Sequence, residues 1–90
     1  MLWKIIRTET FSKEFKKYRK NREFLVALDK KILKLKANPE SIGKELSGRL
    51  HGFKSTRLIG KFRLIFKISN QENFVFLVGF DHRKFNYKNI

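Results

Sequence analysis

The side chains of this chain that could carry acid–base chemistry gather at its C-terminal end. Residues 81–88, DHRKFNYK, supply an imidazole, a phenol and three cations within eight positions. His82 can gain and lose a proton near neutral pH, and Tyr87 can donate or accept one. A structural role competes with this interpretation, because a single His or Tyr near a chain end is more often structural than catalytic.

Two arginines could bind a phosphate beside that cluster. Residues two apart in a strand share a face, and in segment 62–68 an apolar set alternates with Arg63, Ile65 and Lys67. The apolar set is expected to face the helices, which places Arg63 on the uncovered side, beside Arg57 if the preceding strand is its neighbour. Paired guanidiniums suit bidentate binding of phosphate. The alternative is that both are surface cations that deter edge pairing.

The first half of the chain predicts a strand followed by two helices. Bulky apolar residues in segment 2–6 favour a strand of about five residues. From Ser12 the apolar residues follow helical spacing with a basic outer face, and Asn21 interrupts this helix. The same Asn21 can cap a second helix, which Asn38 and Pro39 end because proline forces the preceding residue out of helical geometry. The two segments therefore predict a helical hairpin.

The second half predicts an antiparallel meander. Segment 39–52, rich in glycine, is expected to be an irregular connection pinned to the core by single apolar residues. A strand at 53–58 precedes a β-hairpin, whose strands at 62–68 and 74–80 flank a turn at 69–73. The expected fold is α+β: an N-terminal strand, a helical hairpin, and a three-stranded meander that forms one twisted sheet. Residues 1–90 are expected to form a single domain.

The composition indicates a polyanionic partner. The formal charge is +14, from 22 Lys and Arg against 8 Asp and Glu, while ten Phe residues provide material for a core. No Cys occurs, which excludes disulfides and thiol chemistry. The sequence shows neither a membrane-spanning run nor a signal peptide, so a cytoplasmic protein is expected. No bound cofactor or metal is expected either. Neither nucleotide-binding fingerprints nor a serine-hydrolase motif is present.

Two stretches carry a resemblance to a known family. LSGRLHGFKSTRLIGKFRLIFKI, residues 46–68, followed by GFDHRKFNY, residues 79–87, is similar to the RelE/ParE superfamily of type II toxins. The order of the elements also agrees, and the resemblance spans nearly the whole chain, more weakly in the helices. It implies a fold of the microbial RNase type and an mRNA-cutting endoribonuclease, commonly acting in the ribosomal A site, that a cognate antitoxin silences.

The resemblance also implies roles for individual residues. Cleavage by the RNA's own 2′-hydroxyl needs no metal, and it needs a base, an acid and cations around the phosphate. The implied catalytic set places arginines on the phosphate and shares the acid–base roles between an imidazole and a phenol: Arg57, Arg63, His82, Arg83 and Tyr87. The implied RNA-binding set consists of Lys54, Lys61 and Lys84.

The sequence departs from those members that carry two lysines on the strand at 53–58. Ser55 and Arg57 stand at the corresponding open-face positions, and branches with a His at the position of His82 are the more similar ones. Two alternatives stay open. Relatives of the ParE type inhibit DNA gyrase without cutting RNA, and a noncatalytic RNA-binding module would also explain the charge. The expected partners are a small acidic antitoxin in a hetero-oligomer, mRNA and the ribosome.

Overall fold

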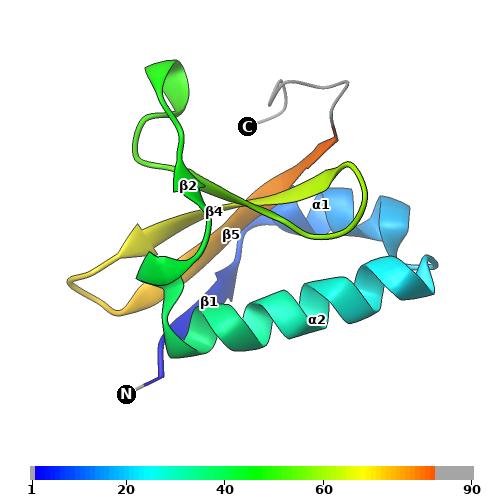
Figure 1. Cartoon of the computed structure of the whole chain (residues 1–90), viewed down its shortest axis with the longest axis horizontal. Helices are drawn as coiled ribbons and strands as arrows, with labels where there is room; N and C mark the ends of the chain where they lie inside the picture. Colours follow the sequence, from blue (N-terminus) through cyan, green and yellow to red (C-terminus); the bar gives the residue numbers. More distant parts are fainter. Residues whose placement is uncertain (1, 83–90) are drawn as a thin grey trace.

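The computed structural model describes residues 2–82, and for His82 the backbone alone. Two helices cover one face of a five-stranded sheet (Figure 1), which confirms the expected α+β fold with its helical hairpin. In chain order the elements are β1 (Lys4–Arg7), α1 (Glu9–Tyr18), α2 (Arg22–Ala37), β2 (Lys44–Glu45), β3 (Lys54–Arg57), β4 (Phe62–Ser69) and β5 (Phe74–His82).

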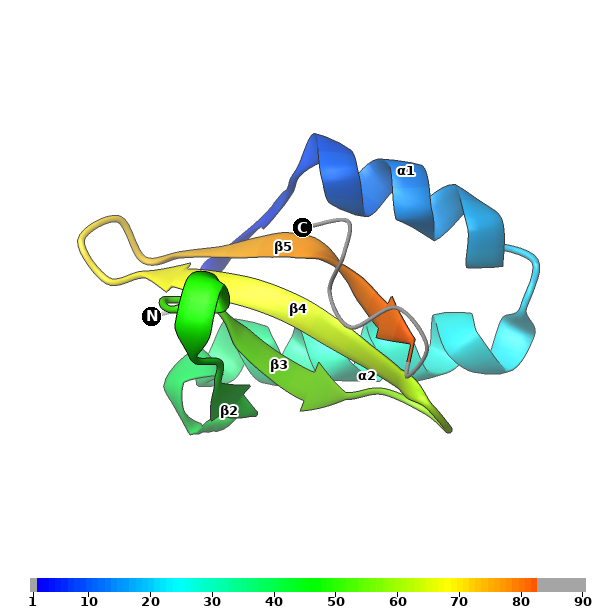
Figure 2. The same cartoon turned by 90° about the horizontal axis from the view of Figure 1, so that it is seen from above.

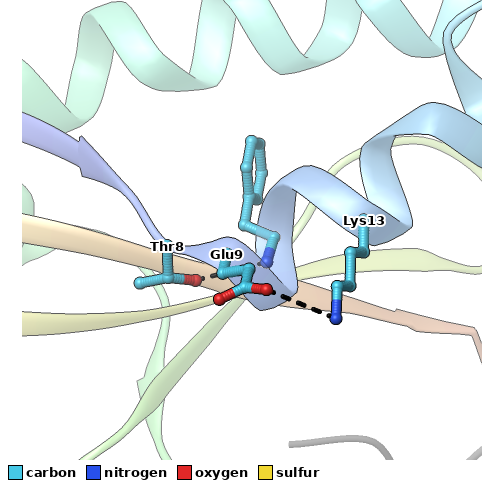
Figure 3. Close-up of polar contacts among 4 residues, drawn as sticks. Thr8, Glu9 and Lys13 are labelled. Atoms are coloured by element: carbon cyan, nitrogen blue, oxygen red, sulfur yellow. Dashed lines mark hydrogen bonds and ion pairs between the residues drawn. The ribbon is translucent and has the colours of Figure 1, made fainter.

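Side-chain caps determine where the helices begin. The Thr8 hydroxyl accepts a hydrogen bond from the Phe11 amide at 3.2 Å, and Glu9 pairs with Lys13 one turn later (Figure 3). This cap starts α1 at Glu9, three residues before the predicted start. The Asn21 side chain accepts from the Phe24 amide at 3.1 Å and starts α2, as predicted, and α2 ends before Pro39.

The strands lie in the order β1-β5-β4-β3-β2. The predicted meander is confirmed, since β3, β4 and β5 pair antiparallel, and β1 joins β5 in parallel. The short strand β2 was not predicted, since it lies in the segment expected to be an irregular connection. Its two residues pair with Ser55 and Lys54 of β3. Gly43 permits this approach, because its φ is +73° and a Cβ there would collide with the Ser55 carbonyl.

A β-bulge interrupts β5. Ile65 pairs with Gly79 but the next residue, Phe66, pairs with Leu77, so Val78 is an extra residue. Simple alternation would place Leu77 and Phe80 on opposite faces, yet both pack in the core. Strict alternation along segment 74–80 therefore does not hold beyond Leu77.

Side chains from α1 and its cap complete the outer edge of β5 beyond β1. The Leu77 carbonyl accepts hydrogen bonds from the Thr8 amide at 3.1 Å and from the Thr8 hydroxyl at 2.8 Å. The Glu14 carboxylate accepts the Phe80 amide at 2.7 Å. These bonds satisfy backbone groups that β1 is too short to reach, and they fix α1 to the strand that ends at His82.

The core between helices and sheet is largely aromatic. Phe24, fully buried, contacts the rings of Tyr18, Phe62 and Phe80 at centroid distances of 5.3, 5.4 and 4.9 Å. Burial, together with the nearby Glu14 carboxylate, raises the pKa of the Tyr18 phenol, which therefore stays neutral and acts as a core side chain. Within residues 2–82, no helix combines the length and the hydropathy needed to cross a membrane.

Candidate functional site

Arg57 on β3 and Arg63 on β4 are paired directly across the two strands. Residues paired in this way point to the same face, with Cβ atoms about 5 Å apart. Leu64 and Phe66 face the helices, so both arginines lie on the face away from them, and both are exposed. Figure 2 shows β3, β4 and β5 side by side. The predicted adjacency of the two arginines is confirmed.

No carboxylate among the described residues forms an ion pair with either guanidinium. Two like charges directly opposite each other on a sheet repel, and Asp81, which is paired with Arg63 on the other side, offsets only part of this repulsion. An oxyanion bound between them would relieve the repulsion and accept several charge-assisted hydrogen bonds. The pair is therefore suited to bind a phosphate.

The row next to the arginine pair on this face is buried. Ser55 and Ile65, which form the next row of the register, are 4% and 0% exposed. Beyond them Lys67 is exposed and lies over the Phe53 ring at 5.6 Å. A second cation, on β1, extends this far end: Lys4 lies 5.9 Å from the Phe74 ring centroid. Accessible cations thus stand at the two ends of the face, with a buried row between them.

The two described lysines of the predicted RNA-binding set lie in different places. Lys61 is exposed in the turn before β4, two residues from Arg63. Lys54 pairs with Phe66, its Nζ donates to the Glu40 carbonyl at 3.0 Å, and it lies over the Phe66 ring. Lys54 therefore lies apart from the two arginines, and its part in RNA binding stays a prediction.

The strand β5 ends at the arginine end of the sheet, and the C-terminal cluster follows it in the sequence. His82, the last residue of β5, pairs with Phe62, and its side chain is not described. Arg83, Lys84 and Tyr87 lie outside the described residues. Their roles remain predictions that the geometry does not test.

Asp81 stands closer to the arginines in register than the sequence suggested. It pairs with Arg63, so Arg57, Arg63 and Asp81 form one row across three strands, and Asp81 is only 6% exposed. The sequence did not single out Asp81 as a candidate site residue. Asp81 joins this row because of the bulge at Val78, and the pattern of residues along the sequence of β5 gave no sign of that bulge.

Comparison with known proteins identifies the family. The model of the ParE toxin of the type II toxin–antitoxin system parDE matches residues 5–87. The chain belongs to this toxin family. It is a type II toxin of the RelE/ParE superfamily, as the resemblance in its sequence implied. No curated protein sequence matches the chain.

Solved structures of toxins in this superfamily share the fold. The RelBE2 toxin–antitoxin complex from Mycobacterium tuberculosis contains a chain 26% identical to this toxin, with a TM-score of 0.78 over 92% of this chain and 100% of that one. A metal-bound toxin from Helicobacter pylori is 27% identical, with a TM-score of 0.75 over 97% and 100%. YafQ from E. coli, 16% identical, matches in fold with a TM-score of 0.78 over 94% and 98%.

The metal in the Helicobacter pylori structure raises the question of ligands in this toxin. In the part of the chain that the structure describes, no three His, Cys, Asp or Glu side chains gather as a metal site would require. The arginine row offers one carboxylate, Asp81, beside two cations, which disfavours a cation there.

Proposed function

We propose that this toxin is a metal-independent endoribonuclease that cuts mRNA, acting in association with the ribosome. The observation that carries the proposal is the exposed pair of Arg57 and Arg63, at the end of the sheet where β5 leads into the segment with an imidazole and a phenol. We expect His82 and Tyr87 to supply the acid–base groups that cleavage of an mRNA phosphate held there needs.

In the proposed reaction the 2′-oxygen of the RNA attacks the adjacent phosphorus. Its proton passes to a base, the bond from phosphorus to the 5′-oxygen breaks, and an acid protonates that oxygen. The products are a 2′,3′-cyclic phosphate and a 5′-hydroxyl. Arg57 and Arg63 would stabilise the charge that builds on the phosphate, with help from Arg83, while His82 and Tyr87 would share the two proton transfers. Lys61 and Lys84 would contact the RNA backbone.

Inhibition of DNA gyrase is the second candidate, and the match to a ParE family model favours it. A gyrase inhibitor needs an interaction surface, but it has no chemical need for an imidazole and a phenol near a phosphate-binding pair. The two functions differ in what induction does to the cell: cut transcripts in one case, and a DNA-damage response with intact mRNA in the other.

Mapping transcript ends by primer extension after induction tests the proposal. The wild-type toxin should halt translation and leave new 5′ ends inside codons, whereas Arg57→Ala with Arg63→Ala, His82→Ala or Tyr87→Phe should relieve this. Arg19→Ala is a matched control, because Arg19 is an exposed arginine at the end of α1. Intact mRNA together with a DNA-damage response would reject the ribonuclease and support the gyrase inhibitor.

We also propose that a small acidic antitoxin is encoded beside this toxin. The charge of +14 would repel another basic protein and attract an acidic one. The Mycobacterium tuberculosis and Staphylococcus aureus structures of related fold are toxin–antitoxin complexes. Co-expression of the neighbouring gene should restore growth, and growth arrest that no neighbouring protein relieves would count against this partner.

A further inference from the structure

Three phenylalanine rings lie outside the hydrophobic core, on the face of the sheet that carries the two arginines. Phe74 and Phe76 flank Val75, which is fully buried against the helices, so their rings point to the other face. Phe53 precedes β3, and its ring lies under the ammonium of Lys67, which pairs with Phe76. All three rings are half-buried. The other phenylalanines of residues 2–82 pack in the core.

These rings form one strip with two lysines. The ring centroids of Phe74 and Phe76 are 5.9 Å apart. The Lys67 ammonium, on β4, lies 5.6 Å from the ring centroid of Phe53, and the Lys4 ammonium, on β1, lies 5.9 Å from that of Phe74. Rings and cations therefore alternate across the sheet, from the start of β3 through β4 and β5 to β1. We call these three rings and two lysines the aromatic patch.

The contacts within the patch are weak. A cation interacts with a ring out to about 6 Å, and at exposed sites this contributes about two- to fivefold to an equilibrium constant. The distances of 5.6 and 5.9 Å lie near that limit. In the part of the chain that the structure describes, neither Lys4 nor Lys67 has a carboxylate partner. A ligand with stronger contacts to rings and cations can therefore displace the lysines from the rings.

Single-stranded nucleic acid carries both groups that such a patch can bind. Every base has a flat π-face, and stacking it on an aromatic side chain contributes about fivefold to more than a hundredfold in affinity. The phosphate beside the base would then contact the lysine that leaves the ring. In a nucleic acid, ring and charge alternate at every residue, as they do along the patch. An acidic peptide matches the charge without this regular alternation of rings.

The patch lies on the route that a strand bound to the arginines would follow. Arg63 and Lys67 are four residues apart on β4, which is about 13 Å at about 3.3 Å per residue. The row between them, Ser55 and Ile65, is buried and presents no charge. Figure 1 shows the segment that leads into β3 on the side of the sheet away from α2, where it borders this face. A strand of a few nucleotides spans such a distance.

We infer that the aromatic patch is a subsite for unpaired RNA, in which bases of the bound strand stack on the three rings and its phosphates contact the two lysines. This inference rests on the proposed function, because the strand it describes is the one whose phosphate the arginines hold. It assigns the far end of the sheet to substrate binding, at a distance from the reacting phosphate.

Fluorescence anisotropy with a labelled 2′-O-methyl RNA of about ten nucleotides tests the inference. The methyl groups block attack by the 2′-oxygen, so binding is measured without cutting. Phe74→Leu with Phe76→Leu keeps apolar side chains but removes two rings, and it should weaken binding about tenfold or more. Phe15→Leu is the matched control, since Phe15 is also half-buried with a cation at 5.8 Å but packs on the helix side. It should stay within about twofold of wild type, and circular dichroism checks that each variant is folded.

An abasic strand and a salt series separate stacking from charge. The double ring variant should bind an abasic strand of equal length as tightly as the wild type does, because no base is left to stack. Lys67→Gln should reduce the slope of log affinity against log salt by about 0.7, whereas the ring variant should leave it unchanged. Equal weakening for both strands, no weakening for either, or no RNA binding by the wild type would each overturn the inference. A poly-glutamate peptide that loses as much affinity through the ring change would favour a protein ligand and also overturn it.

Cutting kinetics distinguish this inference from the proposed function. On a long RNA the double ring variant should raise KM about tenfold with kcat unchanged, because a remote subsite binds substrate and transition state equally. On a dinucleotide, too short to reach the patch, KM should not change. Cutting with an unchanged KM on the long RNA would retain the ribonuclease and reject the subsite. Ring-dependent RNA binding without any cutting would retain the subsite and reject the ribonuclease.

Discussion

The two faces of the sheet carry side chains of opposite kind. On the helix side, Leu64, Phe66 and Leu77 are fully buried against α1 and α2. On the other side, Arg57 and Arg63 are exposed and face each other. The first arrangement stabilises the folded state, because apolar burial is the main favourable contribution to folding. The second places two exposed cations opposite each other, which apolar burial does not explain, so ligand binding is the better reason for it.

Removing a buried ring from the helix side should have the largest effect. Phe24→Ala deletes a fully buried side chain that contacts three other aromatic rings, and it should cost about 3–5 kcal/mol of unfolding free energy. Urea denaturation followed by circular dichroism measures this. Leu33→Ala, at a position 65% exposed on the same helix, is the control and should change stability by less than about 0.5 kcal/mol.

Removing an arginine from the other face should reduce activity and leave the fold intact. Arg63→Ala should lower the rate of RNA cutting about 10²–10³-fold, because one preformed donor to the developing charge is lost. The measurements are the rate at which the variant cuts a model RNA and the melting temperature of the same sample. If the melting temperature falls together with the activity, then the arginine face also contributes to stability, and the two faces do not have separate roles.

The bond between Glu14 and β5 links the two faces, because it holds the strand that carries Asp81. Glu14→Ala leaves the partly buried Phe80 amide without its acceptor and should cost about 1–3 kcal/mol. Glu14→Gln keeps an acceptor oxygen and should cost less. Glu9→Ala is the control, since its ion pair with Lys13 is highly exposed and contributes little. Equal losses from Glu14→Ala and Glu9→Ala would argue against the strand-holding role.

The helix side was largely predictable from the sequence, and the other face only in part. The Asn21 cap and the alternation in 62–68 predicted α2 and the buried face of β4, because caps and side-chain period act locally. Alternation also predicted the Arg57–Arg63 pair. The bulge at Val78 depends on how β5 meets β4 and α1, so no local pattern showed that Asp81 joins the arginine row.

Lys54 shows how two kinds of sequence reasoning can disagree. Alternation places it on the face opposite Ser55 and Arg57, where the structure has it, bonded to the Glu40 carbonyl. The family resemblance, and not the residue pattern, grouped it with the RNA-binding lysines. The residue pattern predicts the face because it follows from backbone geometry. The RNA-binding role of Lys54 rests on the resemblance alone and stays a prediction.

Replacing one arginine should slightly stabilise the free toxin, which is the smallest effect and the most direct test of the comparison. Arg57→Thr removes the repulsion across the strands and introduces a residue that favours strands, so unfolding free energy should rise by about 0.2–1 kcal/mol. Urea denaturation at low and high salt measures the change, and the part due to repulsion should shrink as salt screens it. Arg57→Thr is the informative change, because Arg63 stands across from the buried Asp81 and removing it would also take a cation away from that carboxylate. A loss of stability in Arg57→Thr would mean that this arginine helps to hold the sheet, and the division between a folding face and a binding face would then fail.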